Sequence, residues 1–291
     1  MIDIQLTIFT PTFNRKDTLI NLYHSLSNQT RKDFEWYIID DGSTDNTSDI
    51  VKYFIEQKII KIKYLYKENE GKTVAYNLAL SLTNSKYFTC IDSDDILSNN
   101  FAIENALNQI NNSINHNSKV IGYLFNCIDF KYNVIGNKIN RIFTSTIFDY
   151  YHKNNGYGDK FIIFITQLHK HYFFPYYALE KFVPEALIYN RMSKKYTFIF
   201  FPDNLKMVEY RNDGLSKNYR KLIISNPTGF FTYFNELLDM NISFKSKTYY
   251  SIHCLRLSFH KPIFFKHIKF SLIYLFIFPI SIYLYIRDKF N

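Results

Sequence analysis

The sequence predicts an α/β fold with a mostly parallel central sheet and helices on both faces. Three observations lead to this fold class. Residues 1–110 alternate four apolar, strand-like segments with four amphipathic, helix-like segments. The connections are short, and strand–helix–strand units cross over right-handedly into parallel sheets. Polar segments follow three of the four strands, at the edge of the sheet where such folds bind ligands.

The four expected strands differ in how deeply they are buried. Residues 4–13, 34–40 and 86–92 are largely apolar, whereas residues 59–67 alternate apolar and basic side chains. Alternation with a period of two indicates a strand with one exposed face. The third strand is therefore expected to be half-exposed.

Each strand is followed by a segment with the apolar spacing of a helix. Asn14 is expected to cap the first helix, and Asn99 or Asn100 to start the fourth. Residues 111–180 are less regular, and a hairpin is expected at 130–138. The residues expected to face the sheet are Leu19, Leu22, Tyr23 and Leu26, then Ile50, Val51, Phe54 and Ile55, then Val74, Leu78 and Leu82, and finally Ala102, Ile103, Ala106, Leu107 and Ile110.

The composition favours a large core, and the cysteines favour a reducing compartment. Hydrophobic residues make up 47% of the 291 residues, enough for a large core. Cys90, Cys127 and Cys254 are far apart and odd in number, so no disulfide framework or zinc spacing is visible and a reducing cytosol is expected. The N-terminus lacks a basic segment followed by a long apolar run, so it is not expected to be a secretory signal.

The net charge of +9 is concentrated at the C-terminal end. Residues 241–291 carry eight Lys/Arg side chains and one acid, and they contain the apolar stretch FSLIYLFIFPISIYLYI (270–286). Such a segment favours attachment to a membrane surface with anionic lipid. Pro279 interrupts it near the lower length limit for a span, so an interfacial helix pair is favoured over a single span or a buried helix. No nucleic-acid motif is present, and nucleic acid is not an expected partner.

The segment CIDSDDILSNN (90–100) places three aspartates directly after a strand. Asp92 and Asp94 flank one residue, so in an extended segment both side chains point the same way. Neighbouring carboxylates repel unless a cation is present, and hard oxygen ligands suit Mg²⁺ or Mn²⁺. A solvated, helix-capping turn is the alternative. A second acidic turn, DDGS (40–43), follows a neighbouring strand, and together the two predict a site for a metal-bound nucleotide diphosphate.

Four blocks of the sequence resemble the family 2 glycosyltransferases. They are TIFTPTFNRKDTLINLYHSLSNQT, FEWYIIDDGSTDNT, NEGKTVAYNLAL and YFTCIDSDD, and they cover residues 6–95 in the family's order and at its spacing. The resemblance implies a GT-A fold, a nucleoside-diphosphate sugar donor and inversion at the anomeric carbon.

The resemblance also implies donor-binding roles. Asp40 or Asp41 is implied to accept the N3–H of uracil, which favours a UDP-sugar. Gly71 allows close approach of the backbone, and Lys72 is implied to contact phosphate, with a solvated lysine as the alternative. Asn69 lies in the segment implied beside the base and phosphates. The first loop, whose backbone is implied to lie against the base, consists of Thr10, Pro11 and Thr12.

Asp92 and Asp94 match the DxD pair of the family, which binds a ribose hydroxyl and the metal, so Mn²⁺ or Mg²⁺ is the implied cofactor. Asp95 is implied to share one of these roles. His169 and His171 have the alternate spacing that puts two side chains on one face of a strand. A structural role is favoured for both, since a GT-A metal needs little more than the DxD pair and phosphate.

The catalytic base is expected in the second half of the resemblance. Residues 182–196 resemble a polysaccharide-building subset of the family, which places the base in a Glu-Asp pair. Glu185 stands at the corresponding place but is followed by Ala186. Glu185 is the candidate base, with Glu180 or Asp159 in reserve. An acid that only interacts with the helix dipole is the alternative.

Three residues near the second half of the resemblance are candidates to contact the diphosphate. They are Arg191, Tyr210 and Arg211, the last two within EYRNDGLSKN (209–218). Surface salt bridges are the alternative.

These features predict an inverting, metal-dependent hexosyl- or N-acetylhexosaminyltransferase of bacterial surface glycan synthesis, such as capsule or O-antigen. Its partners are expected to be a UDP-sugar, a glycan or lipid-linked acceptor, and the cytoplasmic, inner face of the cell membrane. Residues 1–110 are expected to form the nucleotide-sugar-binding half of the GT-A domain and 111–220 the acceptor-binding half. Residues 221–291 are expected to form a helical, membrane-associating extension.

Two other classes of function are weighed against this one. A nucleotidyltransferase that forms sugar nucleotides would require a Gly-rich, Arg-containing loop after the first strand, and TPTFNRKD has no glycine. A non-catalytic nucleotide-sugar-binding protein would have a decayed site, and the presence of Asp92, Asp94 and Glu185 counts against it.

Overall fold

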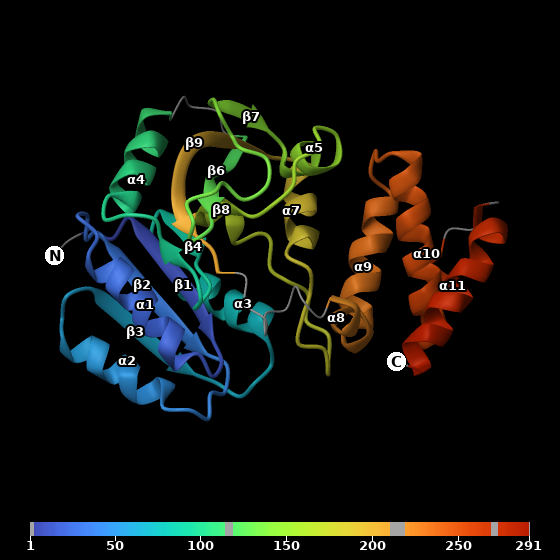
Figure 1. Ribbon diagram of the computed structural model, residues 1–291, viewed down its shortest axis with the longest axis horizontal. Coiled ribbons are helices and arrows are strands. Elements are labelled where there is room, and N and C mark those ends of the chain that lie inside the picture. The colour runs from blue at the N-terminus through green and yellow to red at the C-terminus, as the bar shows by residue number, and fades with distance from the viewer. Residues whose placement is uncertain (1–2, 114–118, 210–218, 269–272, 291) are drawn as a thin grey trace. The chain divides into compact units, whose positions relative to one another are not determined.

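The computed structural model describes residues 3–113, 119–209, 219–268 and 273–290 of the chain. The chain divides into two compact units, one made of residues 1–173 with 192–210 and the other of 174–191 with 211–291 (Figure 1). The helical extension expected at 221–291 falls in the second unit. The roles expected for residues 1–110 and 111–220 remain predictions.

The first unit contains the sheet. Its elements are β1 (Leu6–Thr12), α1 (Lys16–Ser27), β2 (Phe34–Asp40), α2 (Thr47–Glu56), β3 (Lys61–Tyr66), α3 (Lys72–Leu82), β4 (Tyr87–Cys90), β5 (Ile96–Leu97), α4 (Ala102–Asn112), β6 (Val120–Ile128), β7 (Phe143–Ser145), α5 (Ile147–His152), β8 (Lys160–Ile165), α6 (Thr166–His169) and β9 (Thr197–Met207). The alternation of strand and helix predicted for the first 110 residues is confirmed, with the two-residue β5 as an addition.

The described strands form one nine-stranded sheet. Its order is β3-β2-β1-β4-β8-β6-β9-β5, and β7 pairs with β9. The strands β3, β2, β1 and β4 are parallel, as predicted, and so are β6 and β9. The other pairs are antiparallel, so the sheet as a whole is mixed.

The direction of chain progression across the sheet reverses at β1. β2 and β3 lie on one side of β1, and β4 lies on the other. In α/β sheets, ligands bind at the carboxyl ends of the strands at such a reversal. The register sets Thr12 beside Asp40 and Phe9 beside Cys90. The segments that follow β1, β2 and β4 therefore leave from the same edge.

Helices cover both faces of this part of the sheet. Side chains of β1 alternate between the two faces and therefore pack against different helices. Leu6 and Ile8 belong to a buried cluster that includes α1, α2 and α4. Phe9 packs instead against Tyr76 of α3, with the ring centroids 5.5 Å apart, and Tyr76 also meets Phe88 of β4. This arrangement confirms the predicted α/β fold class (Figure 1).

The predicted inward faces of α1 and α4 are confirmed residue by residue. In α2, Val51 and Phe54 are buried, but Ile55 is 41% exposed. In α3 the prediction of Val74, Leu78 and Leu82 is wrong, because the ring of Tyr76 turns a neighbouring face toward the sheet. The buried residues of α3 are Thr73, Ala75, Tyr76, Ala79 and Leu80.

Two local expectations need correction. Asn14 does not cap α1, because Arg15 holds that position and Asn14 has a φ of 52°. At 130–138 the chain makes a turn with a single bridge between Ile128 and Val134, rather than a two-stranded hairpin.

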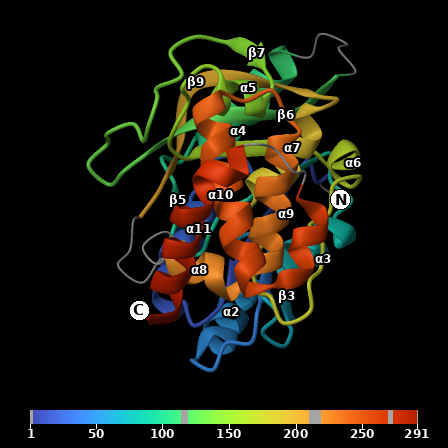
Figure 2. The same cartoon turned by 90° about the vertical axis from the view of Figure 1, so that its right-hand side faces the viewer.

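The second unit is helical. It contains α8 (Tyr219–Ser225), α9 (Pro227–Leu238), α10 (Phe244–His260), the 3₁₀ helix η2 (Pro262–His267) and α11 (Ile273–Phe290), and its boundary with the first unit falls inside α7 (Ala186–Ser193). α10 contacts both α9 and α11, and the three helices are seen together in Figure 2. One apolar cluster joins α9 to α10 through Phe230, Phe234 and Leu257, and another joins α10 to α11.

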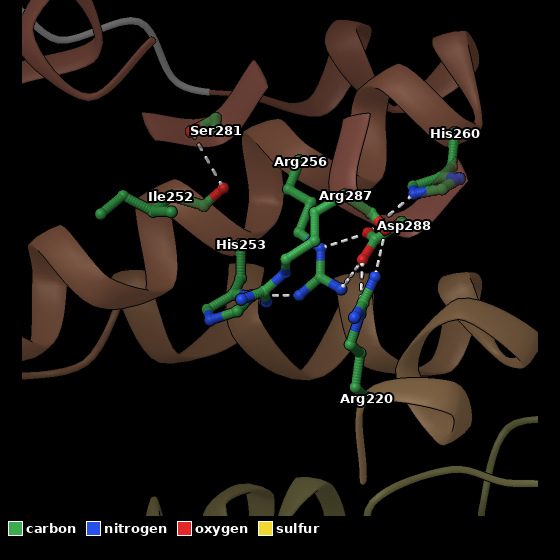
Figure 3. A network of polar contacts seen from close by, with 8 residues as sticks. All are labelled: Arg220, Ile252, His253, Arg256, His260, Ser281, Arg287 and Asp288. Atoms are coloured by element: carbon green, nitrogen blue, oxygen red, sulfur yellow. Dashed lines mark hydrogen bonds and ion pairs between the residues drawn. The ribbon is translucent and has the colours of Figure 1, made fainter. Parts of the chain in front are cut away.

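A buried ionic network fastens the end of α11 (Figure 3). The side chain of Asp288 is fully buried and accepts hydrogen bonds from Arg256 Nη2 at 2.6 Å, His260 Nε2 at 3.0 Å and Arg220 Nε at 3.1 Å. Burial opposes ionisation of Asp288, but these partners outweigh it and hold its pKa below the ordinary value. α8 and α10 are thereby tied to α11.

The apolar C-terminal stretch is only partly described, since residues 270–272 lie outside the described ranges. Pro279 lies inside α11. Within the described residues, every helix is too short or too polar to cross a membrane.

Candidate active site

The loop after β1 is fastened to the loop after β2. Asn14 Oδ1 accepts hydrogen bonds from the backbone N–H of Thr44, at 2.8 Å, and of Asp45, and Asn14 N donates to Ser43 Oγ at 2.9 Å. Asn14 tolerates the left-handed conformation that this geometry requires better than most residues do. The two loops are therefore held together at the carboxyl edge of the sheet.

The three residues predicted for the first loop have different surroundings. The hydroxyl of Thr10 is buried and accepts a hydrogen bond from Trp36 Nε1 at 2.9 Å, so its side chain is occupied. Pro11 is half-buried. The hydroxyl of Thr12 is buried and has no hydrogen-bond partner among the described residues. Their contact with a base remains a prediction.

The turn at 40–43 is held by the chain's own donors. Asp40 Oδ1 accepts from Ser43 N at 2.7 Å, and Oδ2 accepts from the hydroxyl of Tyr64 at 2.7 Å. This contact and burial raise the pKa of Tyr64. Asp40 is 1% exposed, so its first function is to shape the turn.

Asp41 organises the segment before α3. Oδ1 accepts from Lys67 Nζ at 2.7 Å and from Glu70 N at 3.0 Å, and Oδ2 accepts from Gly71 N at 2.8 Å. Each carboxylate oxygen has two lone pairs, so these bonds leave acceptor capacity. The predicted bond from Asp40 or Asp41 to uracil N3–H stays a prediction.

Two glycines allow the segments around 42 and 71 to approach closely. Gly42 has a φ of 90°, and a Cβ there would lie 3.0 Å from the backbone nitrogen of Asn69. Gly71 has a φ of 98° and directly precedes α3. The sequence prediction that Asn69, Gly71 and Lys72 lie near the acidic turns is consistent with these contacts, and their roles toward a ligand remain predictions.

The acidic segment after β4 is a turn and not an extended strand. Asp95 N donates to the carbonyl of Asp92 at 3.0 Å. Asp92 and Asp94 were expected to point the same way because the chain would be extended. The chain is not extended here, so this reason is wrong. The charge of Asp92 nevertheless acts on Asp94, whose pKa it helps to raise.

Asp92 is paired with Lys72 from the first turn of α3. Lys72 Nζ lies 2.8 Å from Oδ1 and 2.9 Å from Oδ2 of Asp92. Burial opposes ionisation of Asp92, but the charges of Lys72 and Lys206 outweigh it and lower its pKa. Asp92 is therefore ionised at neutral pH, with an ammonium group already in place.

Asp94 is compensated less fully, because the charges of Arg15 and Lys72 oppose the rise of its pKa without reversing it. Burial raises the pKa of Asp94, and the negative charge of Asp92 raises it further. A divalent cation beside both carboxylates would relieve this repulsion, and oxygen ligands suit Mg²⁺ and Mn²⁺. The pair therefore fits such an ion, although the described residues contain no group of three or more His, Cys, Asp or Glu side chains arranged around a metal.

Asp95 is directed away into the protein. Its Oδ2 accepts from Lys206 Nζ of β9 at 2.6 Å, and the two side chains are 5% and 11% exposed. Burial raises the pKa of Asp95 to about 6, although Lys206 opposes the shift. A structural role at the base of the turn explains these contacts better than the predicted share in ligand binding, which remains untested.

Lys206 is the residue of this region that the sequence did not indicate. Lys206 is 111 positions away from Asp95 along the chain. It lies in β9, whose residues are a mixture of apolar and polar side chains. The pairing of β5 with β9 brings Leu97 beside Lys206. Sequence position alone carries no signal for this contact.

The three candidate bases differ in their position in the chain and in their hydrogen-bond partners. Glu185 directly precedes α7 in the second unit, is half-buried and accepts from the hydroxyl of Tyr189 at 3.1 Å. Glu180, also in the second unit, accepts from Thr228 N and Gly229 N, both at 2.9 Å. Glu180 thus caps α9, which disfavours it as a base. Asp159 is exposed and lies in the first unit.

Arg191 is engaged by a carboxylate of its own unit. Its Nη2 lies 2.6 Å from Glu236 Oε1, and its Nε lies 3.0 Å from Glu236 Oε2. The predicted contact of Arg191 with a donor is therefore in competition with a bidentate ion pair. Tyr210 and Arg211 lie outside the described residues.

His169 is a core residue. It is fully buried, stacks on Phe164 and shares a hydrogen bond of 2.7 Å with the hydroxyl of Tyr76. Burial lowers the pKa of His169 to about 3, so the ring is neutral. These contacts agree with the structural role favoured for it.

The α/β fold and the polar turns that follow β1, β2 and β4 agree with the class of protein that the comparison with known families identifies. The sequence profile of glycosyl transferase family 2 matches residues 7–179. This match covers more than half of the chain, and the chain belongs to that family.

Relatives match about a third of the chain. An uncharacterised glycosyltransferase of Rickettsia bellii is 36% identical over 98 residues, which are 34% of this chain and 14% of that protein. The putative teichuronic acid biosynthesis glycosyltransferase TuaG of Bacillus subtilis is 37% identical over 91 residues, 31% of this chain and 35% of that protein. The aligned segment thus spans a minor part of each relative.

Solved structures match over most of the chain. S. aureus TarS 1–349 in complex with UDP-GlcNAc has a TM-score of 0.59 at 18% identity, covering 88% of this chain and 73% of that one. The mannosyltransferase PcManGT of Pyrobaculum calidifontis, in complex with GDP-Man and Mn²⁺, has a TM-score of 0.58 at 15% identity, covering 98% and 82%. At these identities the likeness establishes the GT-A fold.

Proposed function

We propose that the chain is an inverting, metal-dependent glycosyltransferase that transfers a sugar from a UDP-sugar to a lipid-linked or polysaccharide acceptor in bacterial surface glycan synthesis. The observation that carries this proposal is the acidic turn at the reversal point of the sheet. There Asp92 and Asp94 stand beside Lys72, and burial together with the charge of Asp92 raises the pKa of Asp94. Carboxylates and an ammonium group together suit a metal-bound diphosphate.

The choice of a nucleotide-sugar donor is supported by family membership and by the acidic turns at 40–43 and 92–95. TarS and PcManGT have been solved with UDP-GlcNAc and GDP-Man. For this chain we favour uracil, because Asp40 or Asp41 retains acceptor capacity for its N3–H, and the buried hydroxyl of Thr12 nearby has no hydrogen-bond partner among the described residues.

The reaction we infer is a direct displacement. An acceptor hydroxyl attacks the anomeric carbon and loses a proton to a base, while the bond from that carbon to the diphosphate oxygen breaks. A divalent cation held by Asp92 and Asp94 would stabilise the charge that develops on the diphosphate. Lys72 contributes a second positive charge there, and Gly71 lets the start of α3 approach the phosphates.

Glu185 is our proposed base. It is half-buried at the start of α7, and a hydrogen bond from Tyr189 orients its carboxylate. Glu180 is less suitable because Thr228, Gly229 and Lys261 all occupy it and lower its pKa. Replacing Glu185 with Gln should abolish transfer while leaving the binding of UDP unchanged.

We further propose that the second unit attaches the protein to the cytoplasmic face of the membrane. α11 exposes large apolar side chains, with Leu275 69%, Phe276 80% and Phe290 83% exposed. Exposed apolar area of this kind marks an interaction surface. The excess of basic residues in 241–291 favours anionic lipid as its partner.

Flotation with vesicles tests the attachment. The full chain should float with vesicles that contain phosphatidylglycerol and much less with pure phosphatidylcholine. Substitution of both Leu275 and Phe276 with Glu should abolish flotation, whereas Tyr53→Glu, at an exposed aromatic residue of α2, should not. Equal flotation of all three proteins would contradict the proposal.

A donor screen tests the proposed activity. The protein is incubated with Mn²⁺ and a panel of radiolabelled nucleotide sugars, and release of free sugar is measured. We expect slow hydrolysis of at least one UDP-sugar and none with Asp94→Asn. No hydrolysis of any UDP-sugar, together with no thermal stabilisation by UDP, would contradict the proposal.

A further inference from the structure

The starting point is the bidentate contact between Lys72 and Asp92. Lys72 Nζ lies within 2.9 Å of both carboxylate oxygens. The backbone under Lys72 is fixed, because Asp41 holds the N–H of Gly71 at 2.8 Å. The ammonium group stands on a flexible four-carbon side chain, so it can change partner while the backbone stays in place.

The charges around the turn are nearly balanced before any ligand arrives. Three carboxylates, those of Asp92, Asp94 and Asp95, face the ammonium groups of Lys72 and Lys206, and the charge of Arg15 also acts on Asp94. Lys206 is committed to Asp95 inside the protein, with a side chain only 11% exposed. Lys72 is twice as exposed, at 22%, and its partner Asp92 is 40% exposed. Of the two lysines, Lys72 is therefore the one that a ligand can displace.

We propose that Lys72 is a resident counter-ion that couples metal binding to donor binding. It neutralises Asp92 until the donor arrives, then moves to the diphosphate as a divalent cation takes its place beside Asp92. The inference rests on the proposed function. It states that the effect of nucleotide on the affinity for metal depends on the side chain of Lys72.

The consequence follows from like-charge repulsion. A divalent cation without nucleotide must approach Asp92 against the charge of Lys72, and it binds weakly. A diphosphate draws Lys72 away, so the cation then binds more tightly. Because coupling is reciprocal, the cation strengthens nucleotide binding by the same factor.

The test measures Mn²⁺ binding to the full chain, with the paramagnetic resonance signal of free Mn²⁺ as readout. Titrations are made without nucleotide and with saturating UDP. For Lys72→Met we expect Mn²⁺ affinity without UDP to rise about ten-fold, and the gain caused by UDP to shrink by a similar factor. Lys72→Arg keeps the charge and should retain most of the coupling.

Two controls make the result specific. Lys52→Met removes a lysine from an exposed pair with Asp49, where both side chains are more than 60% exposed, and should behave as wild type. Lys72→Gln replaces Lys72→Met if circular dichroism shows that the latter is unfolded.

The outcomes separate this inference from the proposed function. Mn²⁺ affinity without UDP that is unchanged or lower in both uncharged variants would overturn the counter-ion role, while wild-type binding of Mn²⁺ and UDP would leave the function intact. A wild type that binds neither Mn²⁺ nor UDP would overturn both.

Discussion

The two acidic turns at the edge of the sheet have similar sequences but different surroundings. In the turn at 40–43, backbone N–H groups, a tyrosine hydroxyl and a lysine hold both carboxylates in place. In the turn at 92–95, Asp94 is left beside the charge of Asp92, and its pKa is raised. The first turn is organised by its own chain, and the second still favours an added cation. Clustered carboxylates alone therefore do not indicate a metal site, and their partners must be counted.

The largest expected effect is on catalysis in the second turn. Asp94→Asn removes a charge that we assign to the metal, and kcat/KM should fall on the order of 100- to 1,000-fold. Stability at neutral pH should stay the same or rise slightly, because the substitution relieves repulsion. Steady-state kinetics and thermal unfolding check both parts. Unchanged kinetics would contradict the claim that the turn at 92–95, unlike the turn at 40–43, holds a metal.

The next effect is on stability in the first turn. Asp41→Ala removes the buried carboxylate from Lys67, whose side chain is 12% exposed and keeps Glu70 as a partner, and it leaves the N–H groups of Glu70 and Gly71 unpaired. Loss of one partner from such a pair destabilises a protein by about 3 kcal/mol. Urea unfolding measures this value. A loss below about 1 kcal/mol would show that the turn does not depend on Asp41.

A smaller effect is expected in the pH dependence of stability. The pKa of Asp95 is raised to about 6 in the folded protein, against 3.8 as the ordinary value. The folded state therefore binds the proton more tightly, and its stability relative to Asp95→Asn should fall as pH rises from about 4 to about 6. The slope is at most about 1.4 kcal/mol per pH unit. Melting temperatures of both proteins across this range check the sign, and a rise with pH would contradict it.

The smallest effect concerns the geometry of the first turn. Gly42→Ala places a Cβ 3.0 Å from Asn69 N at a φ of 90°. Strain in the left-handed region should destabilise the protein by about 1–2 kcal/mol. Chemical unfolding measures the loss, and Gly42→Asn, which tolerates this region better, should lose less. Equal losses would mean that contact with Asn69 dominates.

The sequence predicted those parts that depend on local pattern. The buried faces of α1 and α4 follow aliphatic spacing, and both were predicted residue by residue. The face of α3 was missed because Tyr76 packs on Phe9 and Phe88, a preference that depends on the aromatic face of the sheet and not on the helix itself.

The candidate site divides in the same way. The acidic turns were visible as short motifs at strand ends, but the contacts that distinguish them were not. Lys206 reaches Asp95 only because β9 pairs with β5, far along the chain. The pairing of Lys72 with Asp92 likewise depends on the placement of α3 beside β4. Tertiary contacts of this kind decide which carboxylates are available to a ligand.

The most direct test of the account is UDP binding measured by calorimetry with and without Mn²⁺, on wild type and Asp94→Asn. We predict that wild type binds UDP tightly only with Mn²⁺, and that Asp94→Asn loses the gain caused by the metal. UDP binding that is equally tight in both proteins, or unaffected by Mn²⁺, would contradict the claim that the turn at 92–95 holds a metal-bound diphosphate.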